Sequence, residues 1–102
     1  MNITLKKEED RILREALHHH GIPHQMQILQ EEAAELITAI SHLQRKRPNA
    51  EKECMEEIAD CLICLLQMYL IYKGDIIKNF EHKLARLKGR LNLCSNNTQA
   101  TS

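Results

Sequence analysis

Apolar residues recur along most of this chain at the three- and four-residue spacing of an amphipathic helix. The clearest stripe consists of Ile28, Leu29, Ala33, Leu36, Ile37, Ile40 and Leu43. No run of β-branched residues alternates with polar ones in the way that a half-buried strand requires. The pattern therefore predicts an all-α fold.

Helix-breaking residues divide this pattern into four predicted helices. The breakers lie at Gly21/Pro23, Pro48/Asn49 and Gly74/Asp75. We expect the first helix to start near Thr4 and the fourth to run from about residue 76 to 91. Asn49 is suited to cap the third helix. Because the connection at Pro48/Asn49 is short, the second and third helices are predicted to form an antiparallel hairpin.

The third predicted helix contains a segment, residues 61–72, that is apolar on every side, with Gln67 its only clearly polar member. A helix of this kind has to be buried on all sides, and a four-helix bundle of this size leaves each helix one wet face. We therefore expect a homo-oligomer, either a dimer or a tetramer. The alternative is a monomer with an exposed apolar patch.

Two short acidic pairs lie inside apolar helical stretches, Glu32 with Glu35 and Glu57 with Asp60. Residues three apart share one side of a helix, so each pair can offer two carboxylates to one cation. In a hairpin folded at Pro48/Asn49, residues whose numbers sum to roughly 97 lie level, which places Glu35 within a turn of Asp60. The predicted result is one four-carboxylate site. For a single isolated pair, an ordinary solvated face would be the simpler interpretation.

The ligand set and a basic helix suggest what such a site would bind. Oxygen donors without histidine favour Mg²⁺, with Mn²⁺ as a substitute, and neither pair has the Glu-x-x-His form of di-iron bundles. Carboxylate-held Mg²⁺ is typical of polyphosphate chemistry. Lys83 and Arg86 share one face of the fourth predicted helix and are candidates to bind phosphate oxygens; as ordinary surface cations they would have no such role.

Composition and charge limit the remaining classes. The 102 residues include 14 basic and 14 acidic ones, a balance that argues against a nucleic-acid partner. We expect one all-α domain over residues 1–93 and a polar, disordered tail over 94–102. The beginning of the chain has no apolar signal segment, and no stretch is long enough to cross a membrane. We therefore predict a cytoplasmic protein without a membrane partner.

Cysteine and histidine offer a second possible metal chemistry. The four cysteines are Cys54, Cys61, Cys64 and Cys94, and the histidine cluster comprises residues 18–20 and His24. Three cysteines take apolar positions in one helix, which favours small buried side chains over a zinc site. The histidines are interpreted as a solvated helix end, with adventitious metal binding as the alternative.

Taken together, the acidic and basic motifs resemble those of a known family. Residues 30–36, Gln-Glu-Glu-Ala-Ala-Glu-Leu, followed by residues 56–60, Glu-Glu-Ile-Ala-Asp, are similar to the signature of MazG-like all-α nucleoside triphosphate pyrophosphohydrolases. Residues 83–87 resemble the basic helix of the same family, and the likeness covers roughly residues 20–91. Many relatives continue with an aromatic element that holds the base, whereas this chain has only two Tyr, one Phe and no Trp.

The resemblance implies cleavage of a (d)NTP between its α and β phosphates, which gives the monophosphate and pyrophosphate and requires Mg²⁺. It implies the following roles: metal ligands Glu32, Glu35, Glu57 and Asp60; phosphate binders Lys83 and Arg86; and Glu31 or Glu35 as the base that helps deprotonate water. Glu31 points about 100° away from Glu32 on a helix. The preferred base and sugar stay open.

Two other functions are compatible with the same residues. A non-catalytic helical oligomerisation module would need no divalent ion, and replacing Glu35 and Asp60 by their amides would leave its behaviour intact. A degenerate homologue would bind nucleotides without releasing pyrophosphate. Pyrophosphate release from a panel of nucleoside triphosphates separates these functions from the hydrolase.

Overall fold

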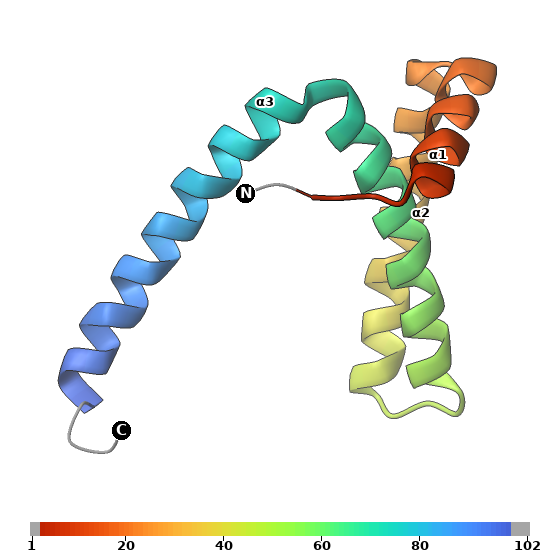
Figure 1. Cartoon of the computed structure of the whole chain (residues 1–102). Helices are drawn as coiled ribbons and strands as arrows, with labels where there is room; N and C mark the ends of the chain where they lie inside the picture. The colour runs from red at the N-terminus through yellow and green to blue at the C-terminus, as the bar shows by residue number, and fades with distance from the viewer. Residues whose placement is uncertain (1–2, 99–102) are drawn as a thin grey trace. The chain divides into compact units, whose positions relative to one another are not determined.

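The protein is built from helices that follow one another with short connections. The computed structural model describes residues 3–98, with side chains described to residue 92. The helices are α1 (Lys7–His20), α2 (Ile22–Gln44) and α3 (Ala50–Thr98), as Figure 1 shows. No strand occurs within residues 3–98. The predicted all-α fold is confirmed.

The first predicted break is present between α1 and α2. Gly21 has φ +87°, which lies in the left-handed region that favours glycine, and its N–H donates to the carbonyl of Leu17 at 2.8 Å. Pro23 follows in the first turn of α2, where its missing N–H has no cost. At the other end of α1, the Lys6 N–H donates to the Glu9 carboxylate at 2.8 Å, which caps the first turn.

The second break forms the predicted hairpin between α2 and α3. The Asn49 carbonyl accepts from the Glu53 N–H at 3.0 Å, so Asn49 has the predicted capping position. The two helices are tied by His42 Nδ1 and Glu53 at 3.1 Å near the turn. Farther from the turn, Gln25 donates to Gln67 at 2.9 Å. The numbers in these pairs sum to 95 and 92, close to the predicted 97, so the hairpin is antiparallel.

The third break differs from the prediction. The backbone of α3 is non-helical at Tyr72 (φ −116°, ψ 33°), and the helical assignment continues from there through Gly74 and Asp75 to Thr98. A glycine inside a helix costs only about 1 kcal/mol relative to alanine, which weakens α3 at Gly74 without ending it. Residues 99–102 of the predicted tail lie outside the described residues, and the tail stays a prediction.

Tyr72 also marks a boundary between two compact units. Among the described residues, one comprises residues 5–71, and the other comprises residues 72–98 with residues 3 and 4. We call α2 with the first part of α3 (50–71) the hairpin, and the later part of α3 (73–98) the arm. No described helix is both long and apolar enough to span a bilayer.

The interior of the first unit is small and partly polar. Its buried apolar side chains are Leu13, Ala39, Ala50, Cys54, Cys61, Cys64 and Tyr69. Gln67 is only 1% exposed. Its amide N–H₂ donates to the carbonyl of Leu13 at 3.4 Å while its oxygen accepts from Gln25. The one polar residue of the apolar segment therefore connects all three helices.

Candidate functional site

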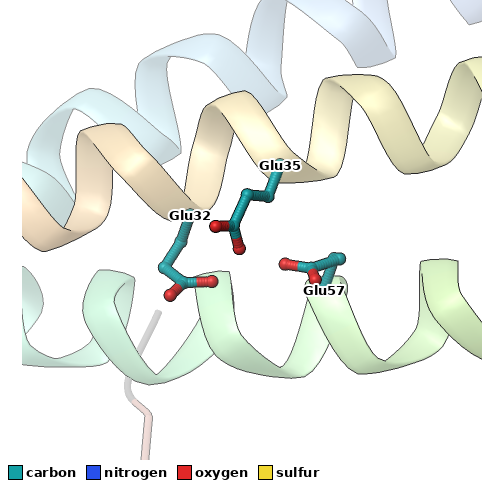
Figure 2. Close-up of side chains that lie close together, drawn as sticks. All are labelled: Glu32, Glu35 and Glu57. Carbon is teal, nitrogen blue, oxygen red and sulfur yellow. The ribbon is translucent and has the colours of Figure 1, made fainter.

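Three of the four predicted carboxylates converge between the two helices of the hairpin. Glu32 and Glu35 come from α2 and Glu57 from α3, and Figure 2 shows their carboxyl groups pointing toward one another. One oxygen from each lies within 4.8 Å of the others. The i, i+3 spacing puts Glu32 and Glu35 on one side of α2, and the hairpin register brings Glu57 opposite them. We call these three residues the carboxylate cluster.

The cluster is partly shielded from water. Oε2 of Glu32 and Oε2 of Glu57 are both buried without a hydrogen-bond partner. A buried carboxylate oxygen that has no partner is costly, because it has lost its water and gained nothing in return. Such oxygens need a proton or a cation. Within the described residues, this combination of proximity and missing partners is the most direct sign of a ligand site.

The pKa values of the cluster also show that its ionised form is disfavoured. Burial, as the largest cause, and the negative charges of Glu35, Glu32 and Asp60 together raise the pKa of Glu57 from 4.5 to about 7. Burial also raises the pKa of Glu32, with Glu35 and Asp60 contributing. Without a cation, the cluster therefore retains a proton near neutral pH. A divalent cation would replace that proton and favour the fully ionised form.

Asp60 is the predicted ligand that stands apart. It is exposed and does not belong to the group of oxygens within 4.8 Å. Its charge nevertheless raises the pKa of both Glu32 and Glu57, so it lies close enough to interact with them. Glu31 is exposed on α2, in agreement with its predicted orientation away from Glu32. The roles of both residues stay predictions.

Two cysteines that are predicted only as small buried side chains interact electrostatically with the carboxylates. Cys61 and Cys64 are free and buried. Burial raises the pKa of both thiols, and the charge of Glu32 raises both further. In the absence of a metal ion the two thiols are therefore held neutral. Two features of the sequence could have indicated this proximity to the carboxylates. Cys61 directly follows Asp60, and Cys64 lies three residues farther on, on the same side of the helix. Cys94 lies outside the described side chains.

The basic residues Lys83 and Arg86 belong to the arm, where both are exposed. They therefore come from a different compact unit than the carboxylate cluster. Their spacing on a helix places them on one face, as predicted. Phosphate binding by these two side chains stays a prediction.

Comparison with known proteins identifies the family. The model of the MazG nucleotide pyrophosphohydrolase domain matches residues 22–94, a span that includes the hairpin, the carboxylate cluster and most of the arm. Neither the curated proteins nor the solved structures that were searched gave a match. Because the family model covers more than half of the chain, this protein belongs to the MazG nucleotide pyrophosphohydrolase domain family.

Proposed function

We propose that this protein is a Mg²⁺-dependent nucleoside triphosphate pyrophosphohydrolase that converts a (d)NTP and water into a (d)NMP and pyrophosphate. The observation that carries the proposal is the carboxylate cluster with its two unpartnered buried oxygens. The family match supports the same class of reaction. The proposed scaffold is an oligomeric helical bundle in which the arm supplies a fourth helical segment.

The carboxylate cluster fits a small hard cation. Two oxygens on opposite sides of one Mg²⁺ lie about 4 Å apart, so oxygens already within 4.8 Å need only a small inward shift. In this proposal Glu32, Glu35 and Glu57 hold the ion from the hairpin, and Asp60 joins them by a change of side-chain rotamer. When bound, Mg²⁺ would neutralise phosphate charge and make the phosphorus more open to attack.

The protein side chains have further roles in the proposed reaction. Water attacks the α-phosphorus, the bond to the bridging oxygen breaks, and pyrophosphate leaves with that oxygen. Glu35 or Glu31 accepts the proton that water gives up. Lys83 and Arg86 bind phosphate oxygens and offset their negative charge. Which base and which sugar the enzyme prefers is open in this proposal.

The test is a panel of ribo- and deoxyribonucleoside triphosphates incubated with the protein and Mg²⁺ and assayed for pyrophosphate. Glu57→Gln should reduce turnover by about 100-fold or more, because even groups that only orient metal ligands commonly contribute 10- to 100-fold. Glu15→Gln is the matched control. It makes the same chemical change at an exposed glutamate of α1 whose surface ion pair with Arg11 contributes little.

The other functions predict different results in this assay. Nucleotide binding without pyrophosphate from any substrate would identify a degenerate homologue. If neither nucleotide nor Mg²⁺ binds, and if the Glu35→Gln/Asp60→Asn variant behaves like the wild type, the protein is a non-catalytic module. In either case the hydrolase proposal is wrong.

A further inference from the structure

An apolar hollow lies between the beginning of the chain and α3, within the first compact unit. Its volume is about 250 Å³, and it is lined by Leu5, Glu9, Ile12, Leu13, Ile63 and Leu66. The hollows at Met55 and at Phe80 are grooves along α3 alone, whereas this one has walls from two segments. Pockets that hold a whole drug-sized ligand have about 300–1,000 Å³. The hollow is therefore suited to one flat part of a larger molecule.

The hollow lies close to the carboxylate cluster along α3. Asp60 interacts electrostatically with Glu32 and Glu57 of the cluster. Ile63 follows Asp60 by one turn, and Leu66 follows it by almost two. At about 1.5 Å per residue, these separations are roughly 4.5 and 9 Å along the helix. In a nucleotide only the ribose separates the α-phosphate from the base, and it spans a gap of this size. A nucleotide whose α-phosphate lies beside Asp60 therefore reaches the hollow with its base.

The walls of the hollow suit the faces of a base. Ile12 of α1 and Ile63 of α3 both line it, and they are 54% and 50% exposed. An apolar ring between such side chains removes their surface from water. The two faces of a nucleobase are apolar, and aliphatic side chains can cover them without an aromatic partner. The hollow thus provides a base contact in a chain that has only two Tyr, one Phe and no Trp.

Glu9 is the only polar residue among those that line the hollow. Its Oε1 accepts from the Lys6 N–H at 2.8 Å, and this bond holds the carboxylate at the start of α1. A carboxylate has about four lone-pair sites on its two oxygens, so the cap leaves acceptors on both. Guanine is the one common base with two adjacent donors, N1–H and the 2-amino group. In adenine, cytosine and uracil the donor has an acceptor beside it, which a carboxylate repels.

We propose that this hollow binds the guanine base of the substrate and that Glu9 accepts hydrogen bonds from N1–H and the 2-amino group, so that the protein prefers GTP and dGTP. The proposal rests on the proposed function and deepens it by naming the substrate class. Glu9 and Ile12 come before residue 22, where the match to the family model begins. The selection of the base is thus assigned to a part of this chain that the family model does not include.

The first experiment compares the hydrolysis of GTP, ITP and ATP, because ITP differs from GTP only in lacking the 2-amino group. For the wild type, kcat/KM should be about 10-fold or more higher with GTP than with ITP, as expected for a bidentate contact to a base. ATP should be no better than ITP.

The variant Glu9→Gln tests the assigned contact. Glutamine can still accept from the Lys6 N–H, but it places an amide donor against the 2-amino group. The kcat/KM for GTP should therefore fall to the level of ITP, through a higher KM with kcat retained. Glu15→Gln, the same change at an exposed glutamate of α1 outside the hollow, should keep the preference for GTP.

The variant Ile12→Asn tests the apolar wall. It puts a polar amide into the hollow and should raise KM for GTP and ITP alike, so that the ratio between the two substrates stays unchanged. Circular dichroism at 222 nm checks that both this variant and Glu9→Gln keep their helices.

A titration with nucleosides tests the hollow without hydrolysis. Guanosine and inosine have no phosphates, so their binding does not depend on Mg²⁺ or on the carboxylate cluster. In nuclear magnetic resonance spectra of the full-length chain, guanosine should shift the amides of residues 5–13 and 63–66. Inosine should bind about 10-fold more weakly, and Glu9→Gln should remove the difference between the two nucleosides.

The two experiments separate this proposal from the proposed function. Hydrolysis of GTP and ITP with equal kcat/KM would overturn the guanine site and leave the proposed function intact. If no triphosphate is cleaved, the proposed function is wrong and the titration alone decides. Shifts at the hollow that are stronger with guanosine would then support the site. An absence of shifts there, or shifts confined to other residues, would overturn it.

Discussion

At the scale of single residues, the carboxylate cluster combines buried oxygens that lack hydrogen-bond partners with negative charges that face one another. The spacing of Glu32, Glu35 and Glu57, together with a hairpin at Pro48/Asn49, is enough to bring the three carboxylates together. The raised pKa of Glu57 depends on burial and on the charges that face it, which no local pattern encodes. For the same reason the exposed position of Asp60 could not be predicted, because it depends on the rotation of α3 against α2.

The pKa of Glu57 leads to a prediction about stability in the absence of metal. The folded protein holds the proton on Glu57 up to about pH 7, whereas an unfolded glutamate loses it near 4.5. The raised pKa therefore stabilises the fold at low pH, and this contribution is lost as the pH rises through 7. Thermal unfolding in EDTA should show stability decreasing between pH 5 and 8, and Glu57→Gln should make that decrease smaller.

Mg²⁺ provides the control for this prediction. Because the ion binds the ionised carboxylates, the increase in melting temperature caused by Mg²⁺ should be small near pH 6 and larger near pH 8. Glu57→Gln should remove most of this increase at either pH. If the stability of the wild type in EDTA does not change between pH 5 and 8, the pKa of Glu57 is not raised in the folded protein.

At the scale of elements, the all-α fold and the first two helix breaks follow from the sequence, whereas the position of the third break does not. Glycine with proline at 21–23 and the turn at 48–49 both stop a helix, because proline removes a donor and Gly21 and Asn49 take positive φ. The sequence pattern predicts a third break at Gly74, but Gly74 has no proline beside it. The irregular residue is instead Tyr72, which no local pattern marks as a break because it lies at the end of an apolar run.

Gly74 provides a test of this interpretation. If α3 is helical at Gly74, then Gly74→Ala should stabilise the helix by about 0.5–1 kcal/mol, because alanine loses less backbone entropy and a Cβ there has open space. Hydrogen exchange of the amides around residues 73–79 should slow by about two- to fivefold. Faster exchange in Gly74→Ala would mean that residue 74 belongs to a turn, as the sequence had suggested.

The pairing of Gln25 with Gln67 gives a second prediction at this scale. Gln67→Leu leaves the amide of Gln25 and the carbonyl of Leu13 without their partner in a buried place, which should destabilise the protein by about 1–3 kcal/mol. The double variant Gln25→Leu/Gln67→Leu no longer has an unpaired Gln25 amide. Its free energy of unfolding should therefore decrease by less than the sum of the decreases in the two single variants. Urea unfolding of the four proteins measures this. Additive losses would mean that the two side chains do not interact.

At the scale of the whole molecule, the balance of 14 basic and 14 acidic residues argues against a nucleic-acid partner. This balance hides a division at Tyr72, because residues 1–71 carry a net charge of −4 and residues 72–102 a net charge of +4. The apolar segment 61–72 led to the expectation of an oligomer. In the structure Leu62, Ile63 and Leu65 are each about half exposed in the single chain, and a partner that covers them has to be consistent with the charges as well.

This division of charge makes the effect of salt on assembly a diagnostic quantity. The screening length falls from about 10 Å at 0.1 M salt to about 3 Å at 1 M, so attraction between exposed opposite charges weakens over this range. Burial of apolar surface is not weakened by sodium chloride in this way. Sedimentation equilibrium should therefore show the dissociation constant of the wild type increasing severalfold between 0.1 and 0.5 M sodium chloride. An assembly held together by buried apolar surface alone would keep its dissociation constant nearly unchanged over this range, and that result would contradict a contribution from the opposite charges of the two parts.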